Sequence, residues 1–380
     1  MGCRERQEKI YDWMNSEGIS LVLFEDCERN RDQSVRYLSG QPGDSILALS
    51  AARKSVLIPW DMHMASLYAD VDEIIPYTKF ELDPYDAAKA AAVFFKIPYG
   101  SKIEIPPSTP YPAFLKYVEA LSDFNVLCRA NGAKNEVDKS RAVKDDSEIE
   151  IYRICAQKTN EIIDLLEKNV MNGSLKTESD IALFIEAECR KLNCDGVGFT
   201  TLAAGPERSF GIHCFPPFTA GDFAAKGLSI LDFGVVYKGY TSDVTLTFAR
   251  SPNKIQENLL SLVEQAFNLA FETTAAAFSS KNELNQGIEC RDIALAVDDF
   301  FRKNGAFIPH GLGHGIGLEP HEAPYLRRPQ SNTWRLEPGN IFTIEPGLYD
   351  PVHGGCRLEN DVLITDAGAE ILTKSKIIRL

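Results

Sequence analysis

Two aspartates in the second half of the chain stand in apolar segments, where an isolated charge is costly. Asp232 lies in the run Ser-Ile-Leu-Asp-Phe, and Asp243 follows it across a turn that we place at Tyr237-Lys238. If the two segments form an antiparallel hairpin about that turn, the carboxylates face one another with Cβ atoms about 5 Å apart. Like charges at that distance repel each other, so the pair predicts a divalent cation between them.

Two glutamates repeat this arrangement near the end of the chain. Glu345 and Glu359 are symmetric about Val352, so a hairpin loop at that residue would pair them as well. Four carboxylates together with one histidine form an oxygen-rich donor set that suits Mn, Co, Fe or Zn in a two-metal arrangement. The alternative is that the acids are separate surface residues on half-exposed strands.

Three of the chain's six histidines fall close together in a glycine-rich segment, at His310, His314 and His321. Glycine on both sides of His314 predicts a close approach of the backbone to metal and substrate. A phosphate-binding loop is another explanation of the glycines, but neither Lys-Ser nor Lys-Thr follows them. The segment therefore supplies the histidine of the predicted metal site.

The elements that must position these residues divide the chain in two. Residues 1–135 alternate short apolar runs with helical spacing, which is typical of an α/β layer domain. A polar, charged stretch at 136–145 predicts a linker, and 146–380 holds all the predicted chemistry. The spacing predicts strands at 19–24, 45–50, 55–60 and 102–105, and helices at 4–15, 62–69, 83–95, 146–169, 178–193, 255–277 and 291–303.

The bulk properties limit the classes of protein that this chain can represent. Its 380 residues suffice for two compact domains. A net charge of -14 argues against nucleic acid and anionic membrane surfaces as partners. Nine cysteines without paired spacing predict reduced thiols, and the first residues carry no apolar signal segment. No apolar run reaches the roughly 20 residues that span a bilayer, so we expect a cytoplasmic protein.

The motifs around these acids and histidines resemble those of the pita-bread metallopeptidases, which include aminopeptidase P, prolidase, methionine aminopeptidase and the metal-free creatinase. The resemblance covers about residues 145–380 and rests on Tyr240-Thr-Ser-Asp243, His310-Gly-Leu-Gly-His314, Thr343-Ile-Glu-Pro-Gly347 and Arg357-Leu-Glu-Asn-Asp361. The runs Val35-Arg-Tyr-Leu-Ser-Gly40 and Leu57-Ile-Pro-Trp-Asp61 resemble the creatinase-like N-terminal domain of aminopeptidase P and prolidase. The implied fold is an α/β N-terminal domain followed by an α+β pita-bread domain.

The resemblance also implies a role for each matching residue. The implied metal ligands are Asp232, Asp243, His314, Glu345 and Glu359. The implied catalytic residues are Glu345, His213, His321 and Arg357, and the implied substrate-binding residue is His310. Two divalent ions are expected, bridged by Asp243 and Glu359, with manganese as the expected metal and cobalt, zinc or iron as alternatives. Leu246 stands where many family members have Arg, which puts a salt bridge beside the metal site in doubt.

The implied function is metal-dependent hydrolysis of the bond between an N-terminal residue and proline, in peptide substrates that carry proline second. The family also implies a homodimer, and the sequence leaves open whether substrates are dipeptides or longer peptides. One alternative is an inactive pita-bread module that binds peptides or proteins. Another is a creatinase-like, metal-free hydrolase of an amidino compound. The intact set of five ligands argues against both alternatives, and the N-terminal domain and His310 argue against methionine aminopeptidase.

Overall fold

The computed structural model describes residues 2–278 and 287–380 of the chain. It contains two compact units, Met1–Arg141 and Ala142–Leu380. The division falls inside the stretch at 136–145 where the sequence suggests a linker. Much of that stretch is helical, because α6 (Ala133–Ala142) runs through it.

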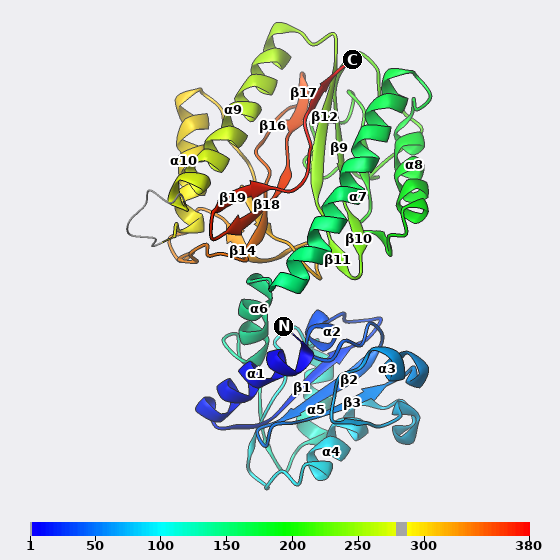
Figure 1. The fold of residues 1–380 in the computed structure, drawn as a ribbon, viewed down its shortest axis with the longest axis vertical. Helices are drawn as coiled ribbons and strands as arrows, with labels where there is room; N and C mark the ends of the chain where they lie inside the picture. The colour runs from blue at the N-terminus through cyan, green and yellow to red at the C-terminus, as the bar shows by residue number, and fades with distance from the viewer. Residues whose placement is uncertain (1, 279–286) are drawn as a thin grey trace. The chain divides into compact units, whose positions relative to one another are not determined.

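The first unit is built on a six-stranded mixed sheet with the strand order β4-β3-β2-β1-β5-β6 (Figure 1). Its strands are β1 (Ile19–Asp26), β2 (Ser45–Ser50), β3 (Lys54–Pro59), β4 (Glu73–Ile74), β5 (Lys102–Glu104) and β6 (Asn125–Leu127). Its helices besides α6 are α1 (Cys3–Glu17), α2 (Gln33–Ser39), α3 (Met62–Tyr68), η1 (Tyr77–Phe80), α4 (Pro84–Phe94) and α5 (Tyr111–Ala120). The alternation of apolar runs and helical spacing therefore predicted this α/β unit correctly.

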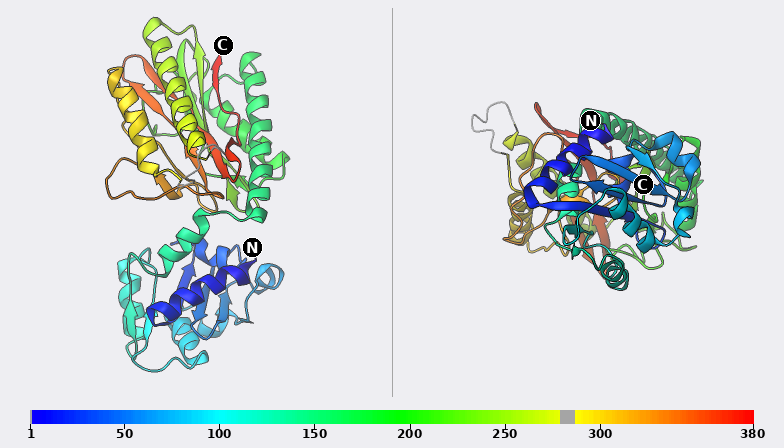
Figure 2. Two further views of the ribbon diagram at one scale, coloured as in Figure 1. Left: turned by 60° about the vertical axis from the view of Figure 1, so that its left-hand side comes forward. Right: turned by 90° about the horizontal axis from the view of Figure 1, so that it is seen from below.

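The second unit places its sheets between two pairs of helices (Figures 1 and 2). The helices are α7 (Asp146–Met171), α8 (Glu178–Lys191), α9 (Lys254–Ala277) and α10 (Cys290–Lys303). The first group of strands is β7 (Gly196–Val197), β8 (Leu202–Ala204), β9 (Gly227–Phe233), β10 (Val235–Tyr237), β11 (Tyr240–Thr241) and β12 (Val244–Arg250). The second is β13 (Gly313–Gly315), β14 (Glu322–Leu326), β15 (Ile341–Ile344), β16 (Gly347–Asp350), β17 (Gly354–Arg357), β18 (Asn360–Thr365), β19 (Gly368–Ile371) and β20 (Ile377–Arg379).

The helices α7, α8 and α9 each begin at a side chain that caps them, whereas α10 begins at Glu289 without a side-chain cap. Asp145 accepts hydrogen bonds from the first backbone amides of α7, and Asn253 does the same for α9. Thr177 and Asp180 form a reciprocal capping box at the start of α8. The apolar faces of α7 and α8 pack on β9 and β12, whereas α9 and α10 pack on β15 and β18. Among the described residues, no helix is both long and apolar enough to cross a membrane.

The first acidic hairpin has a different register from the predicted one. The turn lies at Lys238-Gly239, where both residues have positive φ angles of 50° and 87°, as a two-residue type I′ turn requires. Asp232 therefore pairs with Thr245, and the predicted direct pairing of Asp232 with Asp243 is wrong by two residues. Because side chains alternate with a period of two, Asp243 still projects from the same face of the sheet as Thr245.

The second acidic hairpin has the predicted register. Ile344 pairs with Asn360, and Gly347 pairs with Arg357 on the other side of the acids. The two ladders share one register, which sets Glu345 opposite Glu359 and is symmetric about Val352. Thr245 forms an isolated bridge with Glu359 and so joins the two hairpins.

Candidate active site

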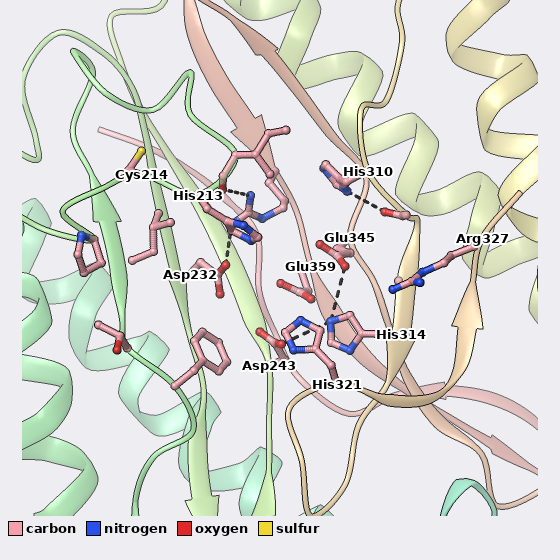
Figure 3. A pocket seen from close by; sticks show the side chains of 18 residues that line it. His213, Cys214, Asp232, Asp243, His310, His314, His321, Arg327, Glu345 and Glu359 are labelled. Atoms are coloured by element: carbon pink, nitrogen blue, oxygen red, sulfur yellow. Dashed lines mark hydrogen bonds and ion pairs between the residues drawn. The ribbon is translucent and has the colours of Figure 1, made fainter. Parts of the chain in front are cut away.

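A cavity of about 400 Å³ in the second unit collects all nine predicted site residues (Figure 3). The residues are Asp232, Asp243, His314, Glu345, Glu359, His213, His310, His321 and Arg357. They come from segments more than 140 residues apart in the chain, so their convergence depends on the pairing of strands. The remaining wall is largely apolar and includes Phe199, Leu202, Ile212 and Pro217.

A row of residues across the joined hairpins places the acids side by side. Asp232 on β9 is opposite Thr245 on β12, which bridges to Glu359, and Glu359 is opposite Glu345. The backbone amide of Glu359 donates to the carbonyl of Thr245 at 3.1 Å. The hydroxyl of Thr245 donates to Glu359 Oε2 at 2.7 Å. Asp243 precedes β12 and points into the same space (Figure 3).

Three of these groups lie close enough to share one ion. Asp243, His314 and Glu359 are buried, and each offers a donor atom within 4.8 Å of the others. His314 Nε2 lies 3.8 Å from Asp243 Oδ2 and 3.6 Å from Glu345 Oε1. These separations leave room for a cation between the donors.

The protonation of His314 fits a metal ligand. Its Nδ1 is 3.1 Å from the carbonyl oxygen of Gly315, so this nitrogen carries the proton and donates it. Burial lowers the pKa of His314 to about 3, which keeps the ring neutral. Nε2 then presents a lone pair toward two carboxylate oxygens. Three acceptors facing one another repel unless a cation or a proton lies between them, so the donor set fits a divalent metal.

The carboxylates also fit a cation site. Burial raises the pKa of Asp243 and Glu359 well above the ordinary carboxyl value, and the neighbouring acids raise both further. Burial also raises the pKa of Glu345 to about 8. Asp232 keeps one buried oxygen, Oδ1, without a hydrogen-bond partner within the described residues. A bound cation would stabilise the charged carboxylates and supply the missing contact of Asp232.

Arg357 connects the acids to the rest of the cavity. Its guanidinium is buried, and it donates to Asp232 Oδ2 at 2.6 Å, to the Thr245 hydroxyl at 3.0 Å and to the Tyr349 hydroxyl at 2.8 Å. The salt bridge beside the site is therefore made by Arg357. Leu246, the departure from the family pattern, is buried in the apolar core beneath α7 and α8.

His310 ends a short chain of hydrogen bonds. Its Nδ1 donates to the carbonyl of Gly311 at 2.7 Å, and burial lowers its pKa to about 4. The neutral ring therefore accepts at Nε2 from the Tyr349 hydroxyl, 3.0 Å away. That hydroxyl accepts in turn from Arg357, so the chain fixes the ring of His310 at the cavity wall.

The other two histidines approach the acids from loops. The ring of His321 lies 4.1 Å from that of His314, centroid to centroid. His213 lies near Asp232, beside Cys214 (Figure 3). Both side chains are thus at the edge of the carboxylate cluster, where a substrate would meet them.

Sequence reasoning missed two residues of the cavity region, Tyr349 and Arg327. Tyr349 stands four residues after Glu345 in the same hairpin, and two-residue alternation could have placed it on the inner face. Arg327 lines the cavity at the end of β14. The pair Arg327-Arg328 gives no sign of which side chain points inward, because that depends on where β14 ends.

Comparison with known proteins identifies the family of this chain. The model of metallopeptidase family M24 matches residues 150–366. The putative dipeptidase YkvY of Bacillus subtilis is 32% identical over 248 residues, which are 64% of this chain and 63% of the relative. This alignment spans less than two thirds of the relative's length.

Two solved structures match the whole fold. An Xaa-Pro dipeptidase from Bacillus anthracis aligns with a TM-score of 0.84 and 26% identity, covering 100% of both chains. An X-Pro aminopeptidase from Thermotoga maritima aligns with a TM-score of 0.82 and 26% identity, covering 98% of this chain and 99% of the other. The α/β unit followed by a pita-bread unit is therefore confirmed. With more than half of its length matched by the family model, the chain belongs to metallopeptidase family M24.

Proposed function

We propose that this chain hydrolyses the peptide bond between an N-terminal residue and proline, with two divalent metal ions. The observation that supports the proposal most strongly is the convergence of four carboxylates and one neutral histidine in a single cavity. Relatives of similar fold are named for Xaa-Pro substrates, as a dipeptidase in one case and as an aminopeptidase in another.

The proposed ligands of the two ions are the five residues of the donor set. Asp243 and Glu359 would each contact both ions, as the family resemblance implies, and they are two of the three buried groups whose donor atoms lie within 4.8 Å of one another. The metals that we propose are Mn first, and Co, Zn or Fe as alternatives, as oxygen-rich sites with one imidazole suit these ions. Bound there, such ions supply Lewis-acid polarisation of the scissile carbonyl and a water of lowered pKa.

The chain's own side chains have separate parts in this proposal. Glu345 takes the proton from the attacking water on a carboxylate oxygen and returns it to the departing proline nitrogen. His213 and His321 donate hydrogen bonds to the oxygen on which negative charge develops. Arg357 orients Asp232 and Tyr349, and Tyr349 orients His310. The apolar walls exclude bulk water and fit a pyrrolidine ring, which has no amide hydrogen to satisfy.

The test compares two dipeptides that differ only at the second residue, Ala-Pro and Ala-Ala, with manganese-loaded protein. A pocket shaped for the ring predicts a kcat/KM advantage for Ala-Pro of about 10–200-fold. Activity is expected to disappear with a chelator and to return with manganese or cobalt. Equal cleavage of both peptides would refute proline specificity and leave a metallopeptidase.

The same experiment addresses the alternative of a binding module. Two metals bound per chain without cleavage of any peptide would place the protein among inactive pita-bread modules. Full activity after complete metal removal would favour creatinase-like chemistry. A homodimer and a cytoplasmic location stay predictions of the sequence.

A further inference from the structure

A second cavity, of about 550 Å³, adjoins the first in the pita-bread unit. Its inner wall is made of aliphatic side chains from α10, β14 and the segment before β13. These residues are Ala294, Val297, Ile308, Leu312 and Leu326. All five are buried in the core, so the cavity has a firm apolar floor.

The two cavities share part of their walls. His310, Gly311 and Arg327 line both of them. In Figure 3, His310 and Arg327 stand on the same side of the carboxylate cluster. A peptide that extends from the carboxylates past His310 therefore reaches the second cavity next.

The wall that the two cavities share has no side chain at Gly311 and carries the positive charge of Arg327. A Cβ atom on Gly311 would lie 3.4 Å from Arg327 Cγ, so a larger side chain at this position would narrow the passage. Arg328 is held in place by Asp298 at 2.9 Å. The guanidinium of Arg327 stacks on the ring of Tyr325 and forms no ion pair with an acid of the described residues. Its positive charge lies close enough to Glu345 to lower the pKa of that carboxyl, so the passage is bordered by a guanidinium that belongs to both cavities.

We propose that the second cavity binds the side chain of the third residue of the peptide substrate and prefers an aliphatic one. The inference rests on the proposed function, and it places the proline of the substrate beside His310, the implied substrate-binding residue, which lines both cavities. The residue after proline then enters at Gly311, where its side chain meets the floor formed by α10. Aliphatic side chains gain from leaving water there, whereas a lysine at this position would bring its ammonium close to Arg327.

The first experiment varies the third residue in the peptides Ala-Pro-Gly, Ala-Pro-Leu and Ala-Pro-Lys, with Ala-Pro as reference. We expect kcat/KM for the leucine peptide to exceed that for the glycine peptide about tenfold or more. The lysine peptide, whose stem is of similar length, should be cleaved no better than the glycine peptide. Cleavage of Ala-Pro with no advantage for leucine would overturn the subsite and leave the proposed function intact.

The second experiment fills the cavity with one substitution and uses a matched control. Ala294→Leu replaces a methyl group on the cavity floor with an isobutyl group, and Ala296→Leu makes the same change on α10 at a position that does not line the cavity. We expect Ala294→Leu to remove most of the leucine advantage, measured as the ratio of kcat/KM for Ala-Pro-Leu to that for Ala-Pro-Gly. Ala296→Leu should keep the ratio, and an equal loss in both variants would contradict the proposal.

The affinity of the protein for the product dipeptides tests the second cavity independently of turnover. The dipeptides Pro-Leu and Pro-Gly correspond to the products that would remain in the site after cleavage. Calorimetry with metal-loaded wild-type protein should give a Kd for Pro-Leu about tenfold below that for Pro-Gly. Equal affinities would refute the subsite, even if no peptide were cleaved and the proposed function had failed.

Discussion

At the scale of single residues, the role of a side chain in the site is indicated by its hydrogen-bond partners, and residue type alone does not give it. Arg357 is engaged by Asp232, Thr245 and Tyr349. Its sequence position suggests a catalytic group, but these contacts favour a residue that orients others. Glu345 differs from Arg357, since its carboxylate is near His314 and its pKa is raised to about 8 by burial. A carboxylate that lies this close to the proposed metal ligands is placed to take a proton from a water held there.

Substitution of Glu345 by Gln tests this proton-transfer role. The amide has nearly the same size and shape, so the fold should persist, but it cannot accept the proton. We expect kcat to fall by about 10²-fold or more. Glu337→Gln, at an exposed position outside the cavity, is the control and should match the wild type. Turnover near wild type in Glu345→Gln with full metal loading would remove Glu345 from the mechanism.

Asp243→Asn tests the proposed bridging ligand. A neutral amide cannot compensate two cations as a carboxylate does, so at least one metal should be lost. The measurement is the metal content per chain after dialysis, which does not depend on activity. Asp366→Asn, at an exposed position, should retain the wild-type content. Two equivalents of metal per chain in Asp243→Asn would contradict the assignment of Asp243 as a bridging ligand.

At the scale of elements, the two hairpins show what the sequence could and could not predict. The symmetry of Glu345 and Glu359 about Val352 gave the correct register, because the loop there is centred on that residue. The first hairpin is not symmetric about the predicted turn, since Asp232 pairs with Thr245 and not with Asp243. Lys238 adopts a positive φ of 50° together with Gly239, which shifts the turn by one residue and the pairing by two. The conformation of a lysine in a turn is set by its neighbours in space and leaves little trace in the sequence.

The glycines on both sides of His314 also make room for neighbouring backbone. The close approach of their own backbone to metal and substrate stays a prediction. A Cβ on Gly313 would lie 1.9 Å from the carbonyl oxygen of Thr343, and one on Gly315 would lie 2.1 Å from that of Ala323. These contacts depend on strands distant in the sequence. The sequence therefore shows that glycines stand at these positions, but it cannot show which neighbouring strands require them.

A buried ion pair supports the loop that carries His321. Lys144 Nζ lies 2.8 Å from Glu322 Oε1, and their side chains are only 1% and 7% exposed. Lys144→Met removes the ammonium from beside a buried carboxylate, and we expect the free energy of unfolding to fall by about 3–5 kcal/mol. Lys144→Met combined with Glu322→Gln should recover part of that loss, since neither charge then remains. Denaturant unfolding of both variants is the measurement, and a loss below about 1 kcal/mol in the single variant would show that the pair contributes little.

At the scale of the whole molecule, the chemistry is confined to one of two compact units. The ligands that we propose all lie between residues 232 and 359, inside Ala142–Leu380. The first unit has its own sheet and its own apolar core. Ligand binding stabilises only the part of a protein that must be folded to bind. Metal binding should therefore act on the stability of the second unit directly.

Metal removal tests this expectation. Without cations, the second unit must bring four carboxylates together in a buried cavity, where their mutual repulsion opposes folding. A ligand at about 1,000 times its Kd contributes about 4 kcal/mol, which corresponds to a rise in Tm on the order of 10 °C for a unit of this size. We expect a chelator to lower by that amount the Tm of the transition that belongs to the second unit.

Hydrogen exchange can assign the effect, because amides of β9, β12 and β18 should lose protection while those of β1 and β2 keep theirs. In Asp243→Asn the chelator should produce a smaller shift. A chelator that leaves the exchange of both units unchanged would contradict metal binding at the predicted site.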